Sequence, residues 1–194
     1  MKRARHFEPG IWSFALVLAT SLIAADPPRV YPIRREIPER GEVPAYLLVM
    51  ASNTFSFIPP AGWTPQGKLD KKQVLFLSPE MDASLSFQII PAELDTNGTV
   101  NPDFFPEQVI DRMPPGNVVG TFPCSVANHK GLGLDLEELA ADKSKISIRA
   151  AWVPVPCGVA EFIFRAPQTR MNELRLVLGR FLASVSEEKY SPRK

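Results

Sequence analysis

Short runs in which apolar and polar residues alternate place the strongest constraint on the fold of this chain. Residues 85–89, 132–136 and 146–152 each carry an apolar residue at every second position. A period of two places these apolar side chains on one face of a β-strand. Because turn residues separate the runs, the sequence predicts an antiparallel sheet whose strands from 118 to 164 form consecutive hairpins.

Residues 171–185 change to a helical period. Apolar side chains recur there in steps of three and four residues: Met171, Leu174, Leu178, Phe181 and Val185. This spacing forms an apolar stripe on one face of a helix, and the stripe needs another layer to pack against. A second, shorter helix is predicted over residues 101–113, where Pro106 suits a first helical turn. The predicted fold class is therefore α+β, with an antiparallel sheet of about six to seven strands covered by helices in an α/β/α sandwich.

The first 25 residues have the features of an export signal. Three basic residues within the first five are followed by a stretch without charges, Ile11–Ala25. A basic start and a short apolar stretch that ends in small residues are typical of a secretory signal. A membrane-spanning helix needs about 20 apolar residues. We therefore expect an exported protein, periplasmic or secreted, and the alternative is a membrane anchor if the segment is retained.

Residues 26–45 are rich in proline and in charges of both signs. Five of the 20 prolines of the chain fall within this segment. Proline removes a backbone donor and biases the preceding residue toward extended geometry. The segment is therefore predicted to be an extended, mostly solvated spacer. It precedes a domain over residues 46–187, and residues 188–194 form a tail.

Five segments with the character of strands or helices carry a resemblance to a known family. They are FSFIPPAGW (55–63), VLFLSP (74–79), SLSFQII (84–90), VAEFIFRAP (159–167) and MNELRLVLGRFLASV (171–185). Over about residues 50–186, this order resembles the PsbP/DcrB-like superfamily of small, mostly exported α/β proteins. The resemblance implies an antiparallel sheet covered by helices and an accessory or binding role. It implies no shared set of catalytic residues.

Cys124 and Cys157 are the only cysteines. An oxidising compartment favours their pairing in an exported chain. Consecutive hairpins place both at the same end of the sheet with one strand between them, about 10 Å apart. A bond therefore requires the loop at Cys157 to curl back. We expect a disulfide between these cysteines, and two buried free thiols are the alternative.

An acidic cluster formed by Asp135, Glu137 and Glu138 is the main candidate for chemistry. Asp135 and Glu137 share one face if this segment is a strand. A turn near residue 142 places Asp135 opposite Arg149, which favours a surface ion pair between neighbouring strands. The alternative is an exported hydrolase or metal-dependent enzyme that uses Asp135, Glu137 and His129. His129 itself is expected to be exposed in a turn.

Several classes of protein are disfavoured by composition and motifs. A formal net charge of +1 does not supply the basic surface that a nucleic-acid-binding protein needs. The chain contains no GxSxG or HExxH motif and no glycine-rich loop before a helix. Trp63 and Trp152 are candidates for a ligand or partner surface, although aromatic residues in strands more often belong to the core.

The sequence therefore predicts a non-catalytic, exported accessory or binding protein. No catalytic, cofactor-binding or metal-ligating residues are assigned to it. Its expected partner is a protein of the cell envelope, which it contacts with one face or edge of its sheet. Contact with a membrane is expected only through the N-terminal segment, if that segment is not cleaved.

Overall fold

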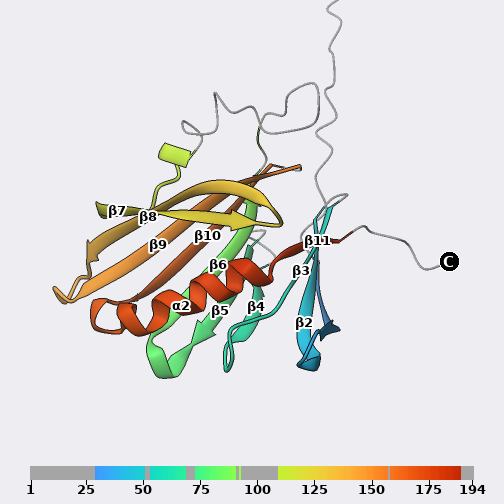
Figure 1. Cartoon of the computed structure of the whole chain (residues 1–194). Helices are drawn as coiled ribbons and strands as arrows, with labels where there is room; N and C mark the ends of the chain where they lie inside the picture. Colours follow the sequence, from blue (N-terminus) through green and yellow to red (C-terminus); the bar gives the residue numbers. More distant parts are fainter. Residues whose placement is uncertain are drawn as a thin grey trace, which may run out of the picture.

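The computed structural model describes residues 29–50, 53–68, 73–90, 92, 109–156 and 158–188 (Figure 1). Within these ranges the chain forms two antiparallel sheets and one long helix. The predicted signal or anchor, residues 1–25, lies outside the described residues, as does most of the predicted tail.

The larger sheet has seven strands, and all neighbouring strands run antiparallel. In spatial order they are β4 (Thr64–Lys68), β5 (Gln73–Ser78), β6 (Ala83–Ile90), β10 (Gly158–Pro167), β9 (Lys145–Val155), β8 (His129–Leu139) and β7 (Asn117–Val126). A 3₁₀ turn, η2 (Pro79–Met81), joins β5 to β6. Strands β7 to β10 are neighbours both in the chain and in space, so the predicted run of hairpins is confirmed.

The smaller sheet has four strands, in the order β1 (Arg29–Ile37), β2 (Gly41–Met50), β3 (Asn53–Phe57) and β11 (Ser186–Glu188). Its first hairpin, β1–β2, occupies most of the segment that was predicted to be a spacer. The hairpin is extended, as expected, but its residues are paired from Arg29 opposite Val49 to Ile37 opposite Gly41. The segment is therefore part of a sheet and not an independent spacer.

Two prolines explain why the sequence pointed to a spacer. Pro32 lies in β1, which is an edge strand, where a missing backbone donor does not interrupt a ladder on both sides. Pro44 lies in β2, but the pairing of β2 with β3 begins only at Tyr46. Both prolines thus occupy positions that a sheet tolerates.

The division of the chain into domains remains a prediction.

One long helix, α2 (Gln168–Ser184), follows β10 directly and crosses one face of the larger sheet (Figure 1). The predicted apolar stripe is confirmed: its buried residues are Met171, Leu174, Leu178, Phe181 and Leu182. The stripe packs against strands of both sheets, including β10, β9, β7 and β3. Burial of these side chains supplies the stability that a helix of this length does not have alone.

The cover of the larger sheet differs from the predicted α/β/α sandwich. On the face that carries α2, the remaining cover comes from the smaller sheet, so the described part of the molecule is mostly β. Of the second helix predicted over residues 101–113, residues 101–108 lie outside the described ranges, and only one short helical turn is seen, at Val109 and Ile110. The cover on the α2 face therefore combines one helix with strands of the smaller sheet.

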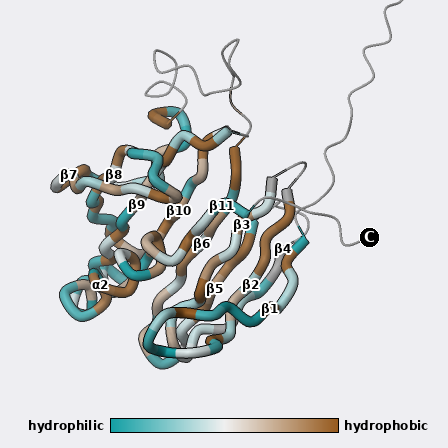
Figure 2. Tube along the Cα trace, turned by 45° about the vertical axis from the view of Figure 1, so that its right-hand side comes forward, coloured by the Kyte–Doolittle hydropathy of each residue, from teal (hydrophilic) through white to brown (hydrophobic). Residues whose placement is uncertain are grey.

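The main core lies between the larger sheet and the layer formed by α2 and the smaller sheet. Its centre is a cluster of aromatic rings: Phe55, Phe57, Phe76, Phe87, Phe162 and Phe181. The rings of Phe87 and Phe162 stack with centroids 4.6 Å apart. Such pairs contribute about 0.5–1.5 kcal/mol beyond the burial of their area. The hydrophobic segments of Figure 2 accordingly lie mainly along the central strands.

The opposite face of the larger sheet is called the open face below, a name that means only that α2 and the smaller sheet do not lie on it. Its residues from β5 to β8 include Leu75, Leu77, Ser84, Ser86, Gln88, Glu161, Ile163, Arg165, Ile146, Ile148, Ala150, Trp152, Leu132, Leu134, Leu136 and Glu138. Around Trp152 and Ile148 this face is buried and forms a second, smaller apolar cluster with Val109. Toward β5 the side chains of Leu75 and Leu77 are only half-buried.

Candidate functional site

The acidic cluster of β8 is distributed over separate ion pairs. Asp135 lies opposite Arg149 of β9, as the sequence predicted, and its Oδ1 accepts a hydrogen bond of 2.7 Å from Nε of Arg149. The pair is less exposed than predicted, because the side chains retain only 19% and 14% of their accessible surface. The guanidinium also lies 3.9 Å from the ring centre of Phe122 on β7. The pair joins neighbouring strands as predicted, but it is partly buried and not a fully exposed surface pair.

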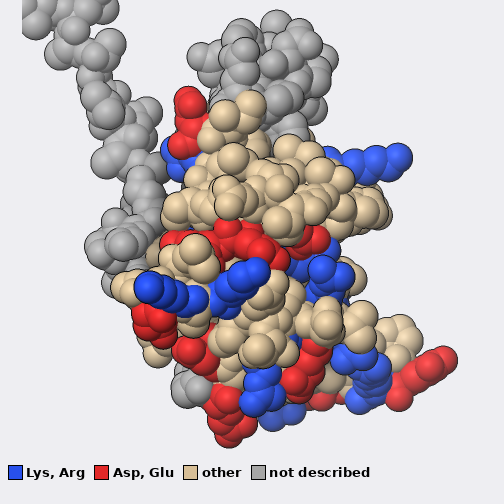
Figure 3. Space-filling model, turned by 90° about the vertical axis from the view of Figure 1, so that its left-hand side faces the viewer, with Lys and Arg blue, Asp and Glu red and all other residues tan. Residues whose placement is uncertain are grey.

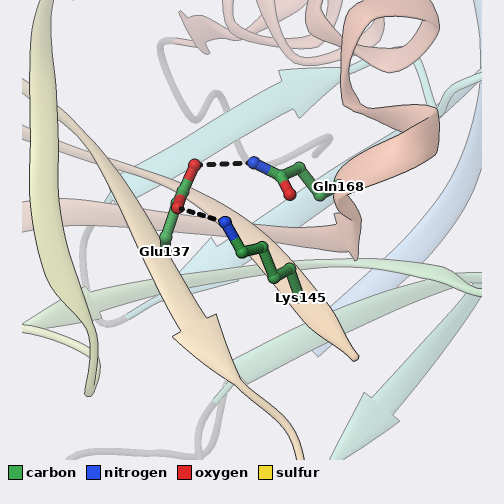
Figure 4. A network of polar contacts seen from close by, with 3 residues as sticks. All are labelled: Glu137, Lys145 and Gln168. Carbon is green, nitrogen blue, oxygen red and sulfur yellow. Dashed lines mark hydrogen bonds and ion pairs between the residues drawn. The ribbon is translucent and has the colours of Figure 1, made fainter. Parts of the chain in front are cut away.

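Glu137 connects β8 to the beginning of α2 (Figure 4). Its Oε1 accepts a hydrogen bond of 2.7 Å from Nε2 of Gln168, the first residue of the helix. Its Oε2 lies 3.8 Å from Nζ of Lys145 on β9. The first turn of α2 contains no acidic residue, and no side chain caps it. Glu137 therefore places a negative charge close to the positive end of the helix dipole, which is a stabilising arrangement.

Glu138 points to the opposite face of β8, since neighbouring residues of a strand alternate. Its Oε2 lies 3.3 Å from Nη1 of Arg165 on β10. That oxygen is buried and accepts no hydrogen bond from a described residue. Each of the three acids therefore has its own cation.

His129 does not join the acids that the enzyme alternative required. It begins β8, six residues before Asp135, which corresponds to about 20 Å along the strand. Its Nε2 lies 4.0 Å from Oε2 of Glu187 on β11. Asp135, Glu137 and His129 are thus not assembled into one site. Across the described ranges, no three His, Cys, Asp or Glu side chains come together as metal ligands would.

Cys124 lies half-buried on β7, and its thiol is not bonded to another sulfur within the described residues. Burial raises the pKa of this thiol to about 11, although contact with the backbone of Gly131 acts in the opposite direction. The thiolate is the reactive form of cysteine, so this side chain is a poor nucleophile at neutral pH. Cys157 lies outside the described residues, and its predicted disulfide with Cys124 remains a prediction.

Neither tryptophan proposed for a binding surface is available at the surface. The exposed fractions are 8% for Trp63 and 0% for Trp152. Trp63 stacks on Phe164 with ring centres 5.9 Å apart. The interpretation of the strand aromatics as core residues is therefore confirmed for both.

A row of polar side chains crosses the open face at Trp152. Glu161 of β10 lies opposite Gln88 of β6 and Trp152 of β9. Nε1 of Trp152 donates a hydrogen bond of 2.8 Å to Oε2 of Glu161, and Nε2 of Gln88 donates to Oε1. Glu161 is only 3% exposed, so these two donors replace the water that a carboxylate otherwise requires. Sequence reasoning missed this group, although an acid inside the apolar run 159–164 was the available signal.

A cleft of about 690 Å³ lies at the other end of the open face. One wall is the β5–β6 turn with Asp82, and the other is the β8–β9 turn, residues 140–144. Four floor residues come from four adjacent strands: Leu77, Ser84, Arg165 and Ile146. In Figure 3, acidic and basic side chains alternate over the lower half of one side of the molecule, and the surface above them is largely uncharged. Two further hollows among the described residues are smaller, at about 300 and 200 Å³.

The edges of both sheets are obstructed. Edge strand β1 contains Pro32, edge strand β4 contains Pro65, and β11 has only three residues. Edge strand β7 contains Pro123 and a bulge between Val118 and Gly120. Prolines, bulges and short strands prevent another strand from pairing with an edge. The edges of the described sheets are therefore poor templates for a further strand.

Among the described residues, no helix is long and apolar enough to cross a membrane.

No family model matches the chain, and no curated protein matches it. Among solved structures, a match is found to the crystal structure of LpqN involved in cell envelope biogenesis of Mycobacterium tuberculosis, with a TM-score of 0.44 and 12% identity. It covers 82% of this chain and 91% of that chain. The likeness is too loose to carry a functional argument, and the resemblance to the PsbP/DcrB-like superfamily remains a prediction.

Proposed function

We propose that this protein is an exported, non-catalytic accessory or binding protein of the cell envelope that works through the open face of its larger sheet. One observation carries the proposal. The open face contains a cleft of about 690 Å³, whereas proline, a bulge or short length obstructs each strand edge. A partner that cannot add a strand has to bind a face.

The arrangement of charged groups supports a binding role over a catalytic one. A pair of carboxylates that hydrolyses a glycoside has to share a cleft, and one of them has to be held protonated. Asp135 is instead bonded to Arg149, and Glu137 to Gln168 at the start of α2. Through these contacts both acids join the sheet strands to one another or to the helix.

The location in the cell envelope rests on the sequence. The basic start and the apolar stretch Ile11–Ala25 have the features of an export signal. Determination of the N-terminus of the mature protein tests this part directly. A chain that begins near Asp26 supports export with cleavage, and a chain that retains residues 1–25 supports a membrane anchor.

The role of the open face is tested by nuclear magnetic resonance of the isotope-labelled chain in a solubilised envelope extract. We expect line broadening at open-face residues such as Leu75, Ser86 and Ile163. The variant Leu75→Asp should abolish the broadening, because a charge would then stand within a half-buried apolar surface. The matched control is Leu176→Asp, since Leu176 is exposed on α2 and lies away from the open face. Broadening that centres on β1 or β7, or that persists in Leu75→Asp, would contradict the proposal.

A further inference from the structure

We propose that the cleft binds a small amphiphile that carries an alkyl chain and a single acidic group. This inference rests on the proposed function and names the ligand of the same site. It is argued from the one cation in the cleft floor, from the apolar lining around it and from the acids at the rim.

Arg165 is the only charged residue in its row across the open face. Its direct neighbours are Ser84 on β6 and Ile148 on β9, and the row continues to Leu77 and Leu136. Nη1 of the guanidinium lies 3.3 Å from Oε2 of Glu138. A guanidinium has five N–H donors arranged as a fork that fits a carboxylate or a phosphate. Arg165 lines the cleft and its side chain is 38% exposed, so an anion in the cleft can approach the guanidinium.

The surroundings of Arg165 fit an alkyl chain. Leu77 and Ile146 lie in the floor, and small apolar residues complete the lining: Ala83, Ala140, Ala141, Ala166 and Pro167. The volume of about 690 Å³ is within the range of about 300–1,000 Å³ that small-molecule sites occupy. Small side chains leave the floor open, and no aromatic ring is available there to stack on a sugar or a base.

The acids at the rim limit the charge of the ligand. Asp82 stands on one wall and Asp142 on the other. Hydrogen bonds from Ser144 lower the pKa of Asp142, which therefore stays ionised. Lys145, on the same side, is paired with Glu137. Two carboxylates at the mouth repel a polyanion, whereas one acidic group can reach Arg165 in the floor.

Three probes with the same ten-carbon chain separate the contributions of head group and chain: decanoate, decanol and decyltrimethylammonium. Each is titrated into the full chain below its micelle concentration and followed by calorimetry. We expect decanoate to bind at least tenfold more tightly than decanol, and decyltrimethylammonium to bind most weakly. Arg165→Gln should weaken decanoate about tenfold or more, because a charge-assisted hydrogen bond is lost, and should leave decanol unchanged.

Two further variants serve as controls, to separate a loss of binding from a general loss of folding. Arg165→Lys keeps the charge and should retain part of the affinity for decanoate, and Arg180→Gln removes an exposed arginine of α2 that does not line the cleft. Equal binding of decanoate and decanol, or unchanged binding by a folded Arg165→Gln chain, would overturn the inference. So would a failure of decanoate to bind at all. In that last case a partner mapped to the open face by resonance broadening would still support the proposed function, so the two failures are distinguishable.

Discussion

The two faces of the larger sheet are built from the same strands but have different chemistry. The face beneath α2 and the smaller sheet is filled with interlocking aromatic rings. The open face carries a buried carboxylate, an arginine and serines among aliphatic side chains, and it ends in a cleft. The aromatic rings stabilise the first face by packing against one another, and its polar groups Asp135, Arg149 and Glu137 are engaged in ion pairs and hydrogen bonds. The face beneath α2 supplies most of the core, and the proposed function assigns binding to the other face.

The largest expected effect comes from the aromatic face. Phe162→Ala removes a ring that stacks on Phe87 at 4.6 Å, and we expect a loss of about 3–5 kcal/mol in the free energy of unfolding. Urea denaturation followed by circular dichroism measures it. The neighbouring residue on the open face provides the control, since Ile163→Ala acts at a half-buried site and should cost less. A greater loss in Ile163→Ala would remove the contrast between the faces.

The buried row of the open face is expected to come second. Glu161→Leu leaves the side-chain donors of Gln88 and Trp152 without their acceptor, and an unpaired buried group costs about 1–3 kcal/mol. The same denaturation experiment checks the value. Glu161→Gln retains one acceptor oxygen and should be the milder change. If Glu161→Leu were as stable as the native chain, the row would have no part in holding β6, β10 and β9 together.

An intermediate effect is expected at the ion pair beneath α2. Asp135→Ala leaves the guanidinium of Arg149 without its partner in a poorly exposed position, so we expect a loss of about 1–3 kcal/mol. The exposed pair Arg170–Glu173 is the comparison, and Glu173→Ala should cost less than about 0.5 kcal/mol. Thermal unfolding in low salt measures both. Equal losses would mean that the covering helix contributes nothing to the strength of the Asp135 pair.

The smallest expected effect concerns the N-terminal hairpin. Nη1 of Arg35 donates a hydrogen bond of 2.8 Å to the carbonyl of Ser184, the last residue of α2. Arg35→Ala should cost about 0.5–1 kcal/mol, because a cation at the negative end of a helix is stabilising. Arg34→Ala is a matched control, since Arg34 forms only an exposed pair with Glu42 at 3.6 Å. Chemical denaturation measures the free energy of unfolding of both variants. Equal losses in Arg35→Ala and Arg34→Ala would contradict the prediction.

The strands and the last helix could be predicted because their signals are local. The alternation in 146–152 and the stripe from Met171 to Leu182 depend only on the period of the backbone. The same periodicity placed Asp135 opposite Arg149, which the register confirms. The burial of that pair was not predictable, because it depends on the distant Phe122 and on α2.

The smaller sheet and the cleft were missed for a different reason. Pro32 and Pro44 remove local strand signals, and only the neighbouring strands show that each occupies a tolerated position. The cleft is formed by two turns that are brought together by the order of β6, β10 and β9. The local sequence around Asp82 and in residues 140–144 does not show that these two turns lie on opposite sides of one cleft. Glu161 likewise acquires its partners only through strand register.

The two ends of α2 are bonded to different sheets, at Gln168 through Glu137 and at Ser184 through Arg35. The helix contains no basic residue in its last turn, so the N-terminal hairpin supplies the charge that the helix lacks there. Opening of that hairpin and fraying of the final helical turn should consequently be one event. Amide protons in β1–β2 and near Ser184 would then exchange with solvent at a common rate.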